Sequence, residues 1–168
     1  MDVHVREATA ADRDAILALH AKLHNVERTL HPNRAPVEEI GNAATIERDA
    51  ELAKNDGCIF VAERDGEIIG CVVTTIDDGD AYLIESDRRF GWIRSISVSE
   101  EARGAGVGRA LMKAAEGRFR NRGLSQIQVY VLAANDRAQS FYADNGFHPY
   151  EISYEKRLDG LDVPKVTQ

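Results

Sequence analysis

The stretch Arg103-Gly104-Ala105-Gly106-Val107-Gly108-Arg109 constrains the fold more than any other part of this sequence. It lies between a strand-like run that ends at Val98 and a segment, residues 107–122, with apolar residues at helical spacing. Glycines at such a junction let successive backbone N–H groups face one concavity, and the helix N-terminus adds its positive dipole end. The stretch therefore predicts a loop that binds a phosphate or pyrophosphate. The alternative is a plain flexible connection.

The charge distribution favours a small anionic ligand. Residues 103–122 contain six basic residues and one acidic residue, whereas the whole chain of 168 residues carries a formal charge of −7. A basic island on an acidic protein fits a small phosphorylated molecule better than a long polyanion. We therefore expect no nucleic-acid partner.

Two common phosphate-binding motifs do not match the loop. A P-loop needs Gly-Lys-Ser/Thr, but Gly108 is followed by Arg109 and Ala110. The dinucleotide fingerprint needs Gly-x-Gly-x-x-Gly, whereas the spacing here is Gly-x-Gly-x-Gly. The loop alone does not identify the ligand.

Length and composition predict one soluble α/β domain over residues 1–158, with a loose polar tail at 159–168. The uninterrupted apolar runs, such as Cys58 to Ala62, are far shorter than the roughly 20 residues that span a bilayer. The first residues do not resemble a signal peptide, so we expect a cytoplasmic protein without membrane contact. Cys58 and Cys71 lie in apolar runs and are expected as free thiols.

Periodicity and breaker residues predict the order of the elements. Helices are expected from Thr9 or Asp12 onward, over 38–54, over 107–122, and from an Asn135 cap to the breaker at 145–146. Strands are expected over residues 3–8, 58–63, 67–76, 82–98 with a break near 86–87, 125–132 and 150–158. Asp65-Gly66 predicts a hairpin between the second and third strands.

A second motif follows the strand predicted over 125–132. Asn135 and Tyr142 are seven positions apart, nearly two helical turns, so they lie on one side of a short helix. Taken alone, Tyr142 is more typical of an amphipathic tyrosine packed under a sheet edge than of a functional residue.

Together, the two motifs resemble the GNAT superfamily of acyl-CoA N-acyltransferases. The order is strand, Arg-x-x-Gly-x-Gly, helix, strand, Asn-x-x-Ala-x-x-Phe-Tyr-x-x-x-Gly-Phe. The matching residues are Arg103, Gly106, Gly108, Asn135, Ala138, Phe141, Tyr142, Gly146 and Phe147. The resemblance is strong over residues 58–147. Before residue 58 it is limited to the arrangement of helices and strands.

The resemblance implies a mixed, mostly antiparallel sheet flanked by helices and splayed between the strand ending at Val98 and the strand over 126–132. Acetyl-CoA is then expected in that cleft. By similarity, the backbone of Ile96, Ser97 and Val98 pairs with the pantetheine arm, and Asn135 and Tyr142 lie along the cofactor. The pyrophosphate is held by the loop residues Arg103, Gly104, Ala105, Gly106, Val107, Gly108 and Arg109.

The reaction implied is direct attack of a primary amine on the thioester. The main-chain N–H of Val98 is the expected oxyanion donor, and Tyr142, with a reference pKa of about 10, is the expected general acid. The strand that enters the loop carries no carboxylate, so the base is not assigned. Glu85 and Glu27 are candidates that would act through water, and for both the alternative is a solvated surface carboxylate.

The acceptor side is expected to draw on the N-terminal helices. Glu27, Arg28, His31 and Arg34 are the predicted acceptor contacts. Arg94 would clamp a carboxylate on the acceptor, or alternatively form an ion pair on the strand surface.

Histidines recur on the first helix, where His20, His24, Glu27 and His31 are spaced by four, three and four residues. The glutamate that follows the first histidine of a zinc hydrolase motif is absent, so we expect no metal. The partner is expected to be a small-molecule or peptide amine, and the family allows a homodimer. The alternative function is an acyl-CoA-binding sensor or structural module without turnover.

Overall fold

The computed structural model describes residues 2–40 and 43–158, and within them a five-stranded sheet has the order β1-β2-β3-β4-β5. The strands are β1 (His4–Glu7), β2 (Cys58–Arg64), β3 (Glu67–Asp78), β4 (Arg89–Val98) and β5 (Ile127–Val129). All neighbours are antiparallel except β4 and β5, which are parallel. The mixed, mostly antiparallel sheet expected from the sequence is confirmed.

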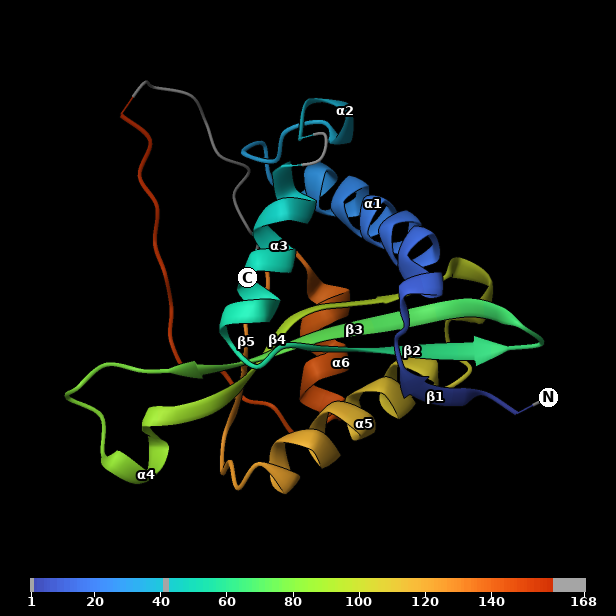
Figure 1. Ribbon diagram of the computed structural model, residues 1–168. Coiled ribbons are helices and arrows are strands. Elements are labelled where there is room, and N and C mark those ends of the chain that lie inside the picture. Colours follow the sequence, from blue (N-terminus) through green and yellow to red (C-terminus); the bar gives the residue numbers. More distant parts are fainter. Residues whose placement is uncertain (1, 41–42, 159–168) are drawn as a thin grey trace.

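Helices cover both faces of this sheet (Figure 1). The chain order gives η1 (Ala10–Asp12), α1 (Arg13–Leu30), α2 (Val37–Ile40), α3 (Ala43–Lys54), α4 (Glu85–Arg88), η2 (Glu100–Ala102), α5 (Val107–Asn121) and α6 (Asp136–Asp144). α1 and α3 lie on one face, and α5 lies on the other with α6 beside it. The helix predicted over 38–54 corresponds to α2 and α3, and residues 41–42 lie outside the described part. The tail predicted at 159–168 also lies outside it.

The larger core is the interface between α5 and the sheet. Leu111, Met112 and Phe119 of α5 are fully buried there. α5 crosses β4 so closely that a Cβ on Gly91 would lie 2.6 Å from the Phe119 ring, which explains a glycine in the middle of a strand. A smaller cluster packs α1 on the opposite face through Ile16 and Leu19.

The β2–β3 hairpin follows the sequence prediction. Asp65 and Gly66 both have positive φ, 54° and 82°, as a two-residue type I′ turn requires. Next to the turn Arg64 pairs with Glu67 and Glu63 with Ile68, and the register shifts by one residue between Glu63 and Ala62. The hairpin therefore fixes the position of β3 beside β2.

The strand predicted over 82–98 was too long at its start. Residues Glu85–Arg88 form the short helix α4, and β4 begins only at Arg89. Tyr82 and Ile84 are exposed, at 79% and 67%, so no core holds them in a ladder. The break predicted at 86–87 is therefore the start of the strand rather than an interruption.

The strands predicted over 125–132 and 150–158 were also wrong in extent. β5 is confined to Ile127–Val129, and after α6 the described chain forms no further strand up to residue 158. It runs along one side of the molecule instead (Figure 1). Tyr150, Ile152 and Tyr154 alternate as in a strand but are exposed, because no neighbouring strand offers them a ladder.

A bulge on β4 marks the point at which β5 leaves it. Val73 faces Ser95 but Thr74 faces Ile93, so Arg94 is an extra residue without a direct partner on β3. β5 pairs with β4 only as far as Ile93. Since a bulge bends and twists its strand, the sheet opens beyond this residue.

Candidate active site

The first part of the site is the edge of β4 that β5 leaves open. Ser99 donates its N–H to the carbonyl of Ile69 on β3 (2.8 Å), which fixes the hydrogen-bonding phase of the ladder. Opposed residues of an antiparallel pair alternate between bonded and non-bonded positions. The backbone groups of Ser97, two residues before Ser99, are therefore hydrogen-bonded to β3. Those of Val98 and Ile96, at the alternate positions, are not.

The backbone N–H and C=O groups of Ile96 and Val98 therefore point away from β3, towards the side that β5 has left. Within the described residues no strand meets them there. The carbonyl of Val98 accepts one hydrogen bond, from Nε of Arg103 (3.3 Å). Of the three backbone positions expected to bind a ligand, two have free groups and Ser97 does not. The Ser97 hydroxyl instead donates to the carbonyl of Leu19 on α1 (3.1 Å).

The glycine loop continues directly from this edge. Gly104 and Gly106 have φ of 76° and 79°, the left-handed region that other residues avoid, and no atom lies within 4 Å of a Cβ placed on either. In residues 2–40 and 43–158, none of the backbone N–H groups from Gly104 to Arg109 makes a hydrogen bond to another backbone or side-chain atom. The loop is therefore a run of free donors that leads into the N-terminus of α5.

The arginines at the two ends of the loop differ in their contacts. Arg103 forms an ion pair with Glu100 (3.1 Å) in addition to its contact with Val98. Arg109 is exposed and has no ion pair in the part of the chain that the structure describes. Arg109 is therefore the loop guanidinium available to an incoming anion.

α6 places Tyr142 against the same core as the loop. Asn135 caps the helix by accepting a hydrogen bond from the Ala138 N–H (3.1 Å), as predicted. Phe141 packs against the loop, since a Cβ on Gly108 would lie 3.0 Å from its ring. Tyr142 is 8% exposed and contacts the rings of Phe141 and Phe147 at 5.4 and 5.6 Å.

The Tyr142 phenol is held in its protonated form. Burial, and secondarily the negative charge of Glu27, raise its pKa to about 12.

The other predicted acceptor contacts are spread around the end of α1. Arg34 Nε lies 3.5 Å from the Glu27 carboxylate. His31 Nε2 lies 2.9 Å from Oε1 of Glu155, in the segment after α6. Arg28 is exposed and forms no ion pair among the described residues.

Arg94 is already occupied by carboxylates. Its Nη2 lies 2.5 Å from Asp77 and 2.7 Å from Glu51, while its Nε donates to the Thr75 hydroxyl (2.8 Å). The guanidinium also stacks 5.0 Å from the Trp92 ring centroid. This is the strand-surface ion pair that the sequence left open as the alternative to a substrate clamp.

Sequence reasoning missed a buried network around His20. Arg48 Nη1 lies 3.0 Å from Nδ1 of His20, and Ser95 Oγ lies 3.1 Å from its Nε2. Because an arginine can only donate, Nδ1 is the acceptor and Nε2 carries the proton. Burial, with the charge of Arg48 second, lowers the His20 pKa to about 4. No local motif signals this contact, since it joins α1, α3 and β4.

Comparison with known proteins agrees with this geometry. A model of the acetyltransferase (GNAT) family matches residues 20–147. The chain belongs to this family. The expectation from the two motifs is confirmed.

Individual members of the GNAT family share part of the sequence. The chain is 38% identical over 93 residues to the mycothiol acetyltransferase of Thermobispora bispora, covering 55% of this chain but only 30% of that protein. It is 27% identical over 147 residues to the N-alpha-acetyltransferase of Sulfurisphaera tokodaii, covering 86% of this chain and 87% of that protein.

Solved structures have the same GNAT fold at low sequence identity. A mutant of the BH1408 protein from Bacillus halodurans has a TM-score of 0.77 at 23% identity, covering 92% of this chain and 99% of that chain. A predicted acetyltransferase with acetyl-CoA from Clostridium acetobutylicum has a TM-score of 0.74 at 18% identity, covering 94% of this chain and 97% of that chain.

In the described residues, no group of three or more His, Cys, Asp or Glu side chains is arranged to hold a metal ion. His20 and His24 of α1 contact Ser95 and Ala35, and His31, directly after α1, contacts Glu155. None of the described helices is long and apolar enough to cross a membrane.

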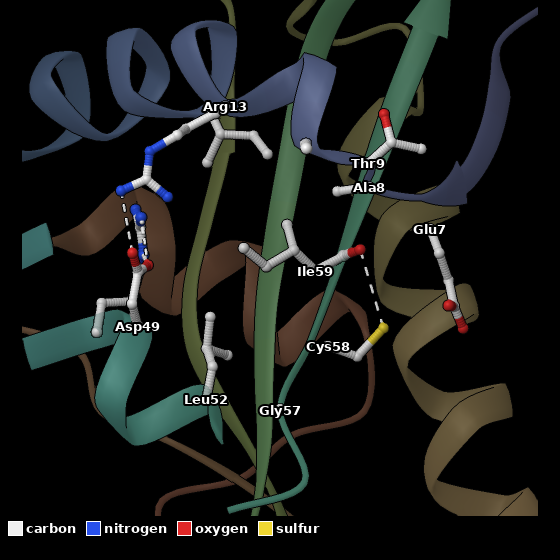
Figure 2. Close-up of a pocket in the computed structure, with 12 residues that line it drawn as sticks. Glu7, Ala8, Thr9, Arg13, Asp49, Leu52, Gly57, Cys58 and Ile59 are labelled. Carbon is white, nitrogen blue, oxygen red and sulfur yellow. Dashed lines mark hydrogen bonds and ion pairs between the residues drawn. The ribbon is translucent and has the colours of Figure 1, made fainter. Parts of the chain in front are cut away.

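A cavity of about 380 Å³ lies apart from the β4 edge, between the start of α1, α3 and the start of β2 (Figure 2). Arg13 and Asp49 form an ion pair on one side of it (3.0 Å). On the other side the Cys58 thiol contacts the carbonyl of Ile59 (3.8 Å). Burial raises the pKa of this thiol to about 11, so it is not a ready nucleophile.

Proposed function

We propose that this protein is an N-acetyltransferase that transfers the acetyl group of acetyl-CoA to a primary amine by direct attack. The observation that carries the proposal is the open edge of β4. Free backbone groups at Ile96 and Val98 continue into the free N–H groups of the glycine loop. An extended ligand with polar groups along its length and a diphosphate at its end fits that series, as acetyl-CoA does.

Main-chain groups hold this co-substrate and share in the chemistry. The N–H groups from Gly104 to Arg109 bind the pyrophosphate, with the free Arg109 guanidinium and the start of α5 adding positive charge. Asn135 and Tyr142 lie along the thioester end. The N–H of Val98 stabilises the oxyanion, a contribution on the order of 3–4 kcal/mol for a preorganised donor.

Tyr142 acts as the acid for the leaving sulfur. With a pKa of about 12 its phenol is fully protonated at neutral pH. A thiol has a reference pKa of about 8.5, so full proton transfer is uphill by roughly 3.5 pKa units unless the phenolate is reprotonated at once. The attacking nitrogen becomes cationic and strongly acidic as the C–N bond forms, and its proton restores the phenol.

The decisive experiment is release of free thiol from acetyl-CoA in the presence of a panel of primary amines. We expect thiol release that depends on the amine, with one acetylated amine formed per thiol. Calorimetric binding of acetyl-CoA without amine-dependent release across the panel would instead identify a sensor or structural module.

The acceptor is proposed to be a small-molecule or peptide amine bound beside the end of α1, where Glu27, Arg28, His31 and Arg34 lie. A homodimer is part of the proposal. It is supported by the outer edge of β5 and by the exposed aromatic residue that directly follows it, Tyr130 at 77%. Light scattering after size exclusion should give twice the monomer mass of 18.6 kDa.

A further inference from the structure

The described chain continues beyond α6 as an extended segment that we call the arm, residues 149–158. Phe147 anchors its start, because the Phe147 N–H donates to the carbonyl of Tyr142 (3.0 Å) and the two rings lie 5.6 Å apart. Every residue of the arm is exposed. In Figure 1 the arm stands apart from the helices and the sheet over most of its length. The core of its own chain therefore does not cover the arm.

The arm nevertheless has the pattern of a strand with one apolar face. Tyr150, Ile152 and Tyr154 alternate with polar residues, so the large side chains lie on one side of the extended chain. Their exposed fractions are 61%, 73% and 89%. Such a pattern is typical of a strand that belongs to a sheet, and a single copy of the chain leaves the apolar face in water.

The backbone of the arm is also without partners. Among the described residues, no backbone N–H or C=O group of residues 149–156 forms a hydrogen bond with another backbone or side-chain atom. Glu155 contacts the rest of the molecule through its side chain, with Oε1 2.9 Å from Nε2 of His31. Fixing an extended backbone costs conformational entropy, and hydrogen bonds to a second strand are the usual compensation.

The sheet has a matching free edge at β5. β5 pairs with β4 on one side, and in the part of the chain that the structure describes no strand lies on its other side. Apart from the ladder with β4, no backbone group of residues 127–131 forms a hydrogen bond to a described residue. This stretch is as long as the apolar part of the arm, residues 150–154.

The β5 edge also lacks the charges with which natural sheets protect an edge strand. β1, at the other edge, carries Arg6 and Glu7, and charged side chains oppose the addition of another strand. Residues 127–131 have the sequence Ile-Gln-Val-Tyr-Val, without a charge or a proline. Tyr130, directly after β5, is 77% exposed. Of the two edges of the described sheet, β5 is therefore the one open to a further strand.

From the free arm and the free edge we infer that the arm of one copy of this chain pairs with the outer edge of β5 in a second copy, and that the second arm does the same in return. The inference rests on the homodimer of the proposed function and identifies the segments that form it. Each exchange adds a strand to the sheet of the other copy. A two-fold axis relates the two exchanges, so both edges are covered and the assembly closes as a dimer.

A second copy fits the arm and the edge better than an unrelated peptide. Each chain has one arm and one such edge, so a reciprocal exchange pairs both, whereas a foreign peptide on β5 would leave the arm unpaired. Large apolar side chains with exposed fractions of at least 61% lie on these segments in each copy: Tyr130, Tyr150, Ile152, Tyr154 and Leu158. At about 150–250 Å² for an aromatic side chain, two copies together can bury on the order of 1,000 Å², the area that a specific interface needs.

Light scattering after size exclusion, over a series of concentrations, tests the exchange. The double variant Ile152→Pro, Ser153→Pro removes two adjacent N–H groups, one of which points towards β5 whichever phase the ladder takes. Because the exchange is reciprocal, the change acts twice in each dimer, and the dimer Kd should rise at least about 100-fold. Ile152→Val, Ser153→Thr is the matched control, which keeps both N–H groups and should dimerise as wild type. Circular dichroism should show that the proline variant is folded, since both positions are exposed in the single chain.

Cross-linking identifies the surfaces that meet. Ser153→Cys on the arm and Tyr130→Cys beside β5 are made in separate proteins, which are mixed so that subunits exchange and then treated with a short bis-maleimide. We expect a covalent dimer with one chain of each kind. His4→Cys is the control partner, because His4 is exposed on β1 at the opposite edge of the sheet, and it should give little product with Ser153→Cys.

Three results would overturn the exchange. One is a dimer that the two prolines do not weaken, and another is cross-linking of position 153 to position 4 as efficient as to position 130; both leave the homodimer itself standing. The third is a protein with both Ser153→Cys and Tyr130→Cys that cross-links only within one chain, which would place the arm on its own β5. A monomeric wild type overturns the exchange together with the homodimer. Amine-dependent thiol release is measured separately, so the proposed acetyl transfer stands or falls on its own.

Discussion

The two halves of the candidate site are built in different ways. The half assigned to acetyl-CoA consists mainly of backbone groups from one continuous stretch, from Ile96 through the glycine loop to Arg109, with the Tyr142 side chain added from α6. The half assigned to the acceptor consists of side chains at and just after the end of α1, where His31 also meets Glu155 of the segment after α6. A backbone site requires only the right φ and ψ angles and a strand that ends early. A side-chain site requires that distant segments meet, so it can vary while the fold stays the same.

The Tyr142→Phe variant tests the comparison most strongly, because Tyr142 belongs to the acetyl-CoA half but contributes a side chain. We expect kcat to fall by about 10²–10⁴ while the Kd for acetyl-CoA changes less than about twofold. The phenylalanine ring keeps its packing against Phe141 and Phe147, so stability should be nearly unchanged. An unchanged kcat would remove Tyr142 from the chemistry and leave a purely backbone site.

The pH dependence of stability tests the other kind of construction, a side-chain network from distant segments, through His20. The unfolded chain binds a proton at this histidine near pH 6.5, whereas the folded chain does so only near its pKa of about 4. Falling pH therefore favours unfolding between these values. At roughly 1.4 kcal/mol per pKa unit this costs about 2–3 kcal/mol between pH 7 and 4.5.

Denaturant unfolding at both pH values measures this effect. His20→Asn should lose less stability on acidification than wild type, by about that amount. His4→Asn, the same change at an exposed position, should follow wild type. An equal loss of unfolding free energy on acidification in all three proteins would mean that the network around His20 does not hold this histidine neutral.

Gly106→Ala tests the acetyl-CoA half without touching any side chain. An alanine at φ 79° costs about 1–2 kcal/mol, which should weaken acetyl-CoA binding by roughly fivefold to thirtyfold. Gly117→Ala is the control, since Gly117 is helical and has open space around its Cβ position. Calorimetry that gives equal Kd values for the two variants would show that the loop geometry does not matter for binding.

Arg94→Met has the smallest expected effect and separates a structural from a substrate-binding role. Removal of the guanidinium leaves Glu51 and Asp77 without their shared partner, and partial exposure limits the cost to about 1–2 kcal/mol of unfolding free energy. Arg120→Met removes an exposed ion pair on α5 and should cost less than about 0.5 kcal/mol. If Arg94→Met kept full stability and raised KM only for acceptors that carry a carboxylate, Arg94 would be a substrate clamp instead.

The difference between a backbone site and a side-chain site also explains which features could be predicted from the sequence. The hairpin at Asp65-Gly66, the Asn135 cap and the glycine loop were predicted because each depends on neighbouring residues. The surroundings of Arg94 and His20 were not, because their partners lie 17 to 75 residues away. The sequence contains one weak signal, because the polar residues Thr75 and Asp77 are two positions apart and therefore lie on one face of β3.

The strand errors have a similar cause. Residues 125–132 and 150–158 have the composition of strands, but a strand forms only where a neighbour completes its ladder. The bulge at Arg94 turns β4 away from β5 after Ile93, so β5 ends at Val129. Local propensity contains no information about a bulge on another strand.

The alternating direction of the backbone N–H and C=O groups along β4 also fixes the position of any ligand that pairs with this strand. Ile96 and Val98 present their free groups two residues apart, a spacing of roughly 6.6 Å along the strand. A ligand that pairs with both must carry its own polar groups at the same interval, and it cannot slide by one residue without losing them. In the proposed complex with acetyl-CoA, the protein backbone thereby sets the distance from the diphosphate at the glycine loop to the reactive carbon, and so selects the atom that would lie beside Tyr142.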